Sequence, residues 1–238
     1  MHGYYASNRE KFKKGMRKLL DPVVPELEAA SGKKYAEVSE EIWDYYDKNL
    51  LERFPYIGGD SVSGTKNLTG AYVFVAMGEI LKRYGAKMEE IGRIMILSYE
   101  RTTLKMPGIA RALMGKVYRS PKLLNKMLVK KDAKNAANAA ANPGSFETQT
   151  QIPPEAGYDF SYHNLVCPLS DFARKYGYEA YMPWLCNLDY VMFGTLGAPL
   201  FREHTCFEDG DYCDFKLKLD AQPLAYWPPV FRQDNPYK

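Results

Sequence analysis

The segment Pro183–Leu219 constrains the fold more than any other part of this 238-residue chain. Its first part opens with a proline, which suits the first turn of a helix, and continues with apolar residues at helical spacing. Two strand-like stretches, residues 198–207 and 212–219, then flank Asp209-Gly210, a dipeptide that two-residue hairpin turns prefer. The segment therefore predicts a helix over residues 183–196 packed on an antiparallel hairpin.

The predicted hairpin also determines which side chains face the core. In residues 212–219 apolar and polar side chains alternate, so Cys213 and Phe215 face inward while Asp214 faces away. With Asp209-Gly210 as the loop, the cross-strand pairs are Cys206 with Cys213, His204 with Phe215, and Arg202 with Leu217. Arg202 and His204 are therefore expected on the inward face beside Cys213, whereas a slip of one residue would turn them to solvent.

The predicted helix adds polar groups next to this face. Cys186 and Asp189 are three residues apart and Phe193 follows four later, so the three share one side of the helix. A carboxylate beside a thiol on a largely apolar helix is rarely placed there for packing alone. The helix and the hairpin together predict a pocket between them, lined by thiols, a carboxylate and cations.

The chain before this segment is predicted to be mostly helical. Amphipathic patterns predict helices over residues 9–30 (interrupted at Asp21-Pro22), 35–50, 67–84, 88–105, 109–118 and 121–128. Residues 130–150 are rich in Ala and Asn, and we interpret them as a solvent-exposed connector. A strand over 159–167 and a helix over 170–176 follow.

These elements predict an α+β fold in two parts. Residues 1–144 form an N-terminal bundle of about six helices, and residues 145–238 form a small antiparallel sheet of at least three strands with a packed helix. The length allows both parts to belong to one compact domain.

Composition excludes several classes of function. The net charge of +3 is small, so it predicts neither a nucleic-acid partner nor an anionic membrane surface. No apolar run is long enough for a signal peptide or a membrane span, so we expect a cytoplasmic protein. The four cysteines are then expected to be reduced, metal-bound or catalytic rather than disulfide-bonded. The loop at residues 55–66 lacks the spacing of a phosphate-binding motif.

Three short motifs carry a family resemblance: Cys167-Pro168, Cys186-x-x-Asp189 and Gly210-x-x-Cys213-Asp214-Phe215. Together they resemble the L-2-amino-thiazoline-4-carboxylic acid hydrolase family, most clearly over about residues 160–219 and more weakly around residues 67–85. The resemblance implies a hydrolase that acts on a non-peptide C–N bond of a small cyclic amino acid. Addition to its amidine-like carbon would open the ring to a carbamoyl-cysteine.

That chemistry needs a nucleophile, a proton donor and an anchor for a carboxylate. Cys167 or Cys186 could supply the attacking thiolate. Asp189 could hold the amidinium-like group or act as a base. From the hairpin register, Arg202 could bind the carboxylate and His204 could shuttle a proton. Cys213 and Asp214 are expected among the substrate-binding residues, and no cofactor is required.

Two other interpretations stay open. The hairpin is more distantly similar to 4-vinyl reductase-type ligand-binding domains, in which a Glu-x-x-Cys and a second Cys hold a metal. Glu203, Cys206 and Cys213, with Cys167 or Cys186, would then form a structural zinc site in a non-catalytic binding domain. In an alternating strand, however, Glu203 points away from Cys206. The last interpretation is an interaction module whose helices dock a partner protein. The favoured partner is a small-molecule substrate, and the sequence leaves a homo-oligomer open.

Overall fold

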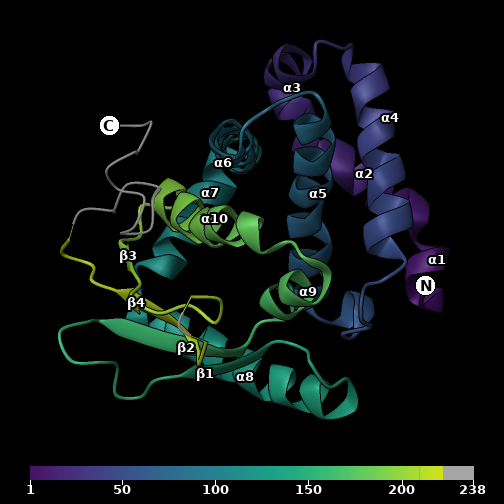
Figure 1. Ribbon diagram of the computed structural model, residues 1–238. Coiled ribbons are helices and arrows are strands. Elements are labelled where there is room, and N and C mark those ends of the chain that lie inside the picture. Colours follow the sequence, from purple (N-terminus) through teal and green to yellow (C-terminus); the bar gives the residue numbers. More distant parts are fainter. Residues whose placement is uncertain (209, 222–238) are drawn as a thin grey trace.

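The computed structural model describes residues 1–208 and 210–221, and these are mostly helical with one four-stranded antiparallel sheet (Figure 1). The α-helices are α1 (Gly3–Ser7), α2 (Arg9–Leu20), α3 (Val24–Ser31), α4 (Tyr35–Tyr45), α5 (Ser63–Arg83), α6 (Met88–Leu104), α7 (Gly108–Tyr118), α8 (Pro121–Ala141), α9 (Pro168–Tyr176) and α10 (Met182–Thr195). The strands are β1 (Glu147–Thr150), β2 (Phe160–Val166), β3 (Leu200–Phe201) and β4 (Cys213–Leu217), in the order β1-β2-β4-β3. The α+β class predicted from the sequence is confirmed.

Short helical segments of other types join these elements. They are the 3-10 turns η1 (Asp21–Val23), η3 (Gly59–Ser61) and η4 (Glu179–Tyr181), and the π-helical η2 (Tyr46–Leu51) that continues α4. None of the helices in the described part of the chain combines the length and the apolar character that crossing a bilayer requires.

Helix α5 forms the centre of the larger hydrophobic core. Its side chains between Leu68 and Leu81 are mostly buried, because apolar residues cover more than one side of this helix. The same core includes residues of α2, α4 and α6 and, from the second part of the chain, residues of α9 and α10. A smaller core lies between α8, α10 and the sheet. Helix α10 therefore connects the helical bundle to the sheet (Figure 1).

Helices α6 and α10 approach each other closely at Gly92. A Cβ atom placed on Gly92 would lie 2.2 Å from two ring atoms of Trp184, which is far inside van der Waals contact. Trp184 is only 8 % exposed, so its ring has little room to move aside. The absence of a side chain at Gly92 is therefore a packing requirement of this helix pair.

We expect Gly92→Ala to destabilise the protein by about 1–3 kcal/mol, because the cost of overpacking exceeds the gain in helix propensity. Gly15→Ala is the matched control. Gly15 also lies inside a helix, has nothing within 4 Å of an added Cβ, and should gain about 0.5–1 kcal/mol. Urea unfolding of both variants measures the difference, and equal stabilisation by the two would contradict the close packing.

The predicted connector at residues 130–150 is wrong for most of its length. Helix α8 continues to Ala141, and β1 follows as a strand that the sequence pattern did not reveal. The polar residues of α8 find tertiary partners: Asp132 accepts hydrogen bonds from Thr148 Oγ1 (2.6 Å) and from the backbone N–H of Thr150 (2.7 Å). These contacts compensate for the low helix propensity of Asp and Asn and attach α8 to the sheet.

The predicted two-residue hairpin is also wrong. Strand β3 ends at Phe201, which pairs with Lys216, and β4 begins only at Cys213, so the two strands are not joined by a two-residue turn. The observed register is shifted by two residues from the predicted one, which preserves the alternation of the strands, so Arg202 still faces inward. Asp209, the first residue of the predicted turn, lies outside the described residues.

Candidate active site

A cavity of about 630 Å³ lies between α10, the sheet, α5 and α8. Its walls are mainly apolar, and a small set of polar and thiol groups faces into it, as in many small-molecule sites. Those groups come from Ser63, Lys66, Asn67, Tyr99, Tyr118, Lys131, Asn135, Thr148, Tyr162, Asn164, Cys167, Cys186, Asp189, Arg202 and Cys213. The pocket predicted between the helix and the inward face of the sheet therefore exists, and the helical part of the chain closes it.

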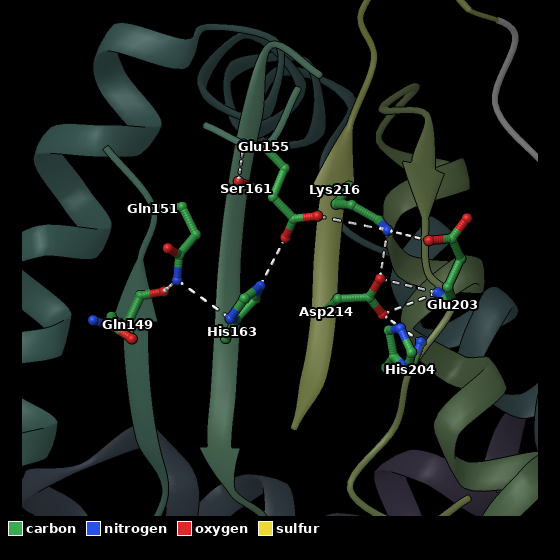
Figure 2. Close-up of polar contacts among 9 residues, drawn as sticks. All are labelled: Gln149, Gln151, Glu155, Ser161, His163, Glu203, His204, Asp214 and Lys216. Atoms are coloured by element: carbon green, nitrogen blue, oxygen red, sulfur yellow. Dashed lines mark hydrogen bonds and ion pairs between the residues drawn. The ribbon is translucent and has the colours of Figure 1, made fainter. Parts of the chain in front are cut away.

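The register of β2 and β4 explains which residues of the sheet face the cavity. Asn164 pairs with Cys213 and Tyr162 pairs with Phe215, and all four line the cavity. The alternate residues project from the opposite face, which Figure 2 shows. Asp214 belongs to that opposite face, as the alternation predicted.

Arg202 and Asp189 form an ion pair inside the cavity. Arg202 is 5 % exposed; its Nη1 donates to Asp189 Oδ2 (2.7 Å) and its Nη2 donates to the carbonyl of Cys186 (3.0 Å). Asp189 is enclosed by protein, yet its side chain keeps 38 % exposure because it faces the empty space. Burial raises the pKa of Asp189, and the charges of Arg202 and Lys131 oppose that rise. The guanidinium therefore holds an accessible carboxylate in a fixed position.

Asp214 positions the segment that carries Arg202 (Figure 2). Its carboxylate is 1 % exposed and accepts the backbone N–H groups of Glu203 (2.9 Å) and His204 (2.7 Å). The same carboxylate pairs with the buried Lys216 Nζ (2.7 Å). A carboxylate thus replaces the strand partner that Glu203 and His204 would otherwise need, which is the physical reason why the hairpin ladder stops at Phe201.

We expect Asp214→Asn to lower the free energy of unfolding by about 3 kcal/mol, since it leaves Lys216 with only partly exposed partners. Glu203→Gln is the matched control: Glu203 also contacts Lys216 Nζ (2.7 Å) but is 69 % exposed, so its loss should cost less than about 1 kcal/mol. Chemical denaturation of both variants distinguishes the two. Similar costs would mean that Asp214 does not organise the segment.

Burial makes two of the cavity thiols weakly acidic. It raises the pKa of Cys167 to about 12, although the backbone N–H groups of Ser170 and Leu169 at the start of α9 oppose the rise. Burial also raises the pKa of Cys186, which the charge of Arg202 opposes. Both thiols therefore stay protonated at neutral pH.

Cys213 has the opposite tendency. Contact with Cys206 lowers the pKa of Cys213, burial opposes this change, and the positive charge of Arg202 lowers the pKa further. The backbone N–H of Cys206 also donates to Cys213 Sγ (3.2 Å). Cys206 itself does not line the cavity, and its own thiol pKa is raised by its contact with Cys213. Cys213 is thus the cavity thiol with the greatest thiolate character.

Two functional groups on α8 were missed by the sequence analysis. Lys131 lines the cavity and makes no ion pair with any acidic residue in the described ranges. Burial lowers its pKa, while the charges of Asp132 and Asp189 oppose that change. Asn135 is 7 % exposed and donates to Thr148 Oγ1 (3.0 Å). The Ala-rich composition of this segment gave no indication of a site. The helical spacing of Leu124, Leu128 and Lys131 is the one signal that could have placed Lys131 on the same face of a helix as the two leucines.

His204 and Glu203 lie away from the cavity. His204 is exposed and its backbone follows the Asp214 contact, so the expectation of an inward His204 is wrong. Glu203 contacts Lys216 on the other face of the sheet (Figure 2). Within residues 1–208 and 210–221, no three potential ligands among His, Cys, Asp and Glu gather closely enough to hold a metal ion.

A comparison with known protein families matches the part of the chain that forms the cavity. The family model described as L-2-amino-thiazoline-4-carboxylic acid hydrolase matches residues 68–217, which is more than half of the chain and runs from α5 to the end of β4. No curated protein and no solved structure matches this chain. The match includes Cys167, Cys186, Asp189, Arg202 and Cys213, and so extends well beyond the three short motifs. The chain therefore belongs to the L-2-amino-thiazoline-4-carboxylic acid hydrolase family.

Proposed function

We propose that this protein hydrolyses L-2-amino-thiazoline-4-carboxylate, or a close relative, with Cys213 as the nucleophile. The observation that carries the proposal is the shared cavity in which a thiol of lowered pKa lies near an accessible carboxylate held by a buried arginine. A cyclic amidine offers an electrophilic carbon and a cationic nitrogen group. Those two features are complementary to a thiolate and a carboxylate.

The proposed reaction proceeds in two steps. The Cys213 thiolate adds to the amidine carbon. The C–S bond of the ring, rather than the C–N bond expected from the sequence, then breaks as the ring sulfur leaves and takes up a proton. The result is a ring-opened isothiourea bound to Cys213. Water then adds to the same carbon, and collapse of that adduct forms the urea carbonyl and releases the Cys213 thiolate. The sum is the addition of one water molecule to the substrate.

Asp189 serves both steps in this scheme. Its carboxylate accepts hydrogen bonds from the amidinium nitrogens before the attack, and it takes a proton from the attacking water afterwards. The raised pKa of Asp189 favours the second role, because it brings the carboxylate closer to the operating pH. Tyr118 and Tyr162 border the same cavity, and burial raises the pKa of both, so they remain neutral phenols able to donate hydrogen bonds.

Lys131 is the group best placed to bind the substrate carboxylate. The sequence predicts Arg202 for that role, but both Nη atoms of Arg202 already donate hydrogen bonds, to Asp189 and to the Cys186 carbonyl. Lys131 faces the cavity without an ion-pair partner among the described residues. An anionic ligand would supply the opposite charge that this partly buried ammonium group lacks.

We expect Lys131→Met to raise the KM for L-2-amino-thiazoline-4-carboxylate about 10- to 100-fold, because a charged hydrogen bond is lost. The same variant should leave the KM for 2-aminothiazoline, which has no carboxylate, nearly unchanged. Comparing the two substrates separates loss of the anchor from a general defect. A similar rise for both substrates would assign Lys131 a structural role.

The proposal is tested by incubating the purified protein with L-2-amino-thiazoline-4-carboxylate and following the appearance of a free thiol and of carbamoyl-cysteine. Turnover that persists in the presence of a chelator and stops after thiol alkylation supports the proposed site. Metal analysis of the same sample tests the alternative of a zinc-containing binding domain. Stoichiometric zinc together with no turnover of this compound or of ring-substituted relatives would overturn the proposal.

A further inference from the structure

A second feature of the molecule lies outside the cavity, in the chain between Leu104 and Lys131. This stretch contains eight basic residues and no acidic one. They are Lys105, Arg111, Lys116, Arg119, Lys122, Lys126, Lys130 and Lys131. Among the described residues, none of the eight takes part in an ion pair, whereas four of the six cations of α2 pair with Asp47, Asp60 or Glu40. The net charge of the whole chain conceals this local excess.

The same stretch contains most of the large apolar side chains that are exposed in the described residues. They are Leu104, Ile109, Leu113, Met114, Leu123, Met127 and Val129, against four in the rest of the described chain. Ile109 is 88 % exposed and Leu113 is 63 % exposed. Scattered exposed apolar residues need no explanation, but a concentration of this kind usually marks an interaction surface.

The packing of α7 shows how these residues become exposed together. Gly115, the buried residue of this helix, approaches the carbonyl oxygen of Leu196 so closely that an added Cβ would lie 2.8 Å from it. The helix therefore contacts the body of the protein through its glycine side. Ile109, Leu113 and Lys116 follow one another at spacings of four and three residues, so they share the exposed side.

Helix α8 contacts α7 and repeats the mixture of charged and apolar side chains. Lys122, Leu123, Lys126 and Met127 are all exposed, with Lys130 one turn beyond Lys126. We refer to the exposed side chains of residues 104–130 as the basic apolar surface. Met127 belongs to it and also lines the cavity, so the surface borders the candidate active site.

We propose that the basic apolar surface binds an anionic lipid bilayer. Lysines and arginines that lack an ion-pair partner in the protein are attracted to anionic headgroups. Exposed aliphatic side chains between them can enter the boundary between headgroups and acyl chains. Nucleic acid accounts for the cations but offers no apolar phase for Ile109 and Leu113. This inference does not depend on the hydrolase activity, and it concerns binding at the membrane surface rather than insertion across it.

Co-sedimentation of the purified full-length protein with vesicles tests this proposal without any assay of catalysis. We expect binding to phosphatidylcholine vesicles that contain about 30 % phosphatidylglycerol and little binding to phosphatidylcholine alone. Binding should weaken as salt rises to about 0.5 M, because exposed charges are then screened. Equal binding to both kinds of vesicle, or binding to neither at low salt, would overturn the proposal.

Surface variants test the two contributions separately. The triple variant Lys116→Glu, Lys122→Glu, Lys126→Glu should bind the anionic vesicles at least about tenfold more weakly. The double variant Ile109→Ser, Leu113→Ser should also bind more weakly, and its remaining binding should be more sensitive to salt. The control is Lys14→Glu, Lys18→Glu, which reverses two exposed lysines on α2 and should have little effect.

Two results would contradict the assignment of lipid binding to the basic apolar surface. One is an equal loss of binding in the α2 control, which would indicate a general effect of net charge. The other is tighter binding to single-stranded RNA than to the vesicles with no effect of Ile109→Ser, Leu113→Ser, which would identify a polyanion site instead. Thermal unfolding of each variant checks that it remains folded during the measurement.

Discussion

Cys213→Ser is expected to lower kcat for L-2-amino-thiazoline-4-carboxylate by about three orders of magnitude or more, as removal of a nucleophile does in other covalent enzymes. Serine keeps the size of the side chain and can still accept the N–H of Cys206, so the fold should be preserved. Its hydroxyl is not deprotonated at neutral pH, because the hydrogen bond from Cys206 and the charge of Arg202 cannot lower an alcohol pKa far enough.

Cys167→Ala and Cys186→Ala are the matched controls for this prediction. Both thiols line the same cavity, but their pKa values are raised, so each variant should retain measurable turnover. Iodoacetamide labelling provides a direct comparison: Cys213 should react first, with a half-maximal rate at a pH below the ordinary thiol pKa. Complete loss of activity in Cys186→Ala with activity retained in Cys213→Ser would return the nucleophile to the position first predicted from the sequence.

Arg202→Met should reduce both stability and activity. The free energy of unfolding is expected to fall by about 2–4 kcal/mol, since the substitution breaks a buried charge pair. The methionine cannot lower the pKa of Asp189 or of Cys213, as the guanidinium does. Asp189 would then be protonated over a wider pH range and Cys213 would ionise only at higher pH. We therefore expect kcat/KM to fall at least about 100-fold at neutral pH and to recover partly at alkaline pH.

Arg202→Lys separates charge from geometry in this prediction. Lysine keeps the positive charge, but it cannot contact both Asp189 and the Cys186 carbonyl with a planar fork. The pH profile of Arg202→Lys should resemble that of the unsubstituted protein. Its activity should lie between that of the unsubstituted protein and that of Arg202→Met. An unshifted pH profile in Arg202→Met would show that Arg202 has no influence on the reacting groups.

The sequence predicted the inward position of Arg202 correctly, although the hairpin register was wrong. A shift of two residues preserves the alternation of a strand, so Arg202, Cys213 and Phe215 remain on the cavity side. The error affected His204, because the chain leaves the ladder after Phe201. That departure depends on a side chain, Asp214, which accepts backbone N–H groups in place of a strand. Strand periodicity carries no information about such a contact.

The role of α8 was less accessible to sequence analysis. Asn and Asp lower helix propensity, and Ala alternating with Asn shows no apolar stripe beyond Leu128. The helix persists because Asp132 and Asn135 bind to β1, and these contacts are tertiary. Lys131 is brought to the cavity by the same attachment. The sequence therefore indicates the thiols and the carboxylate of this site more readily than it indicates Lys131.

Net charge describes the distribution of charge along this chain incompletely. A total of +3 is unremarkable, yet it combines an acidic balance elsewhere with eight unopposed cations between Leu104 and Lys131. Local charge is visible in the sequence when it is counted over a window. The exposure of the apolar residues in the same window is not visible in the sequence, because the pattern of α7 resembles that of a helix buried on one side.

The most direct test of the account is acid quenching of the protein during turnover of L-2-amino-thiazoline-4-carboxylate, followed by mass spectrometry. The proposed ring-opened intermediate retains every atom of the substrate, so a fraction of the protein should gain the mass of one substrate molecule. Peptide mapping should place that mass on Cys213, and the adduct should be absent from Cys213→Ser. Turnover at the normal rate in Cys213→Ser, with no adduct on any cysteine of the unmodified protein, would contradict covalent catalysis by this residue.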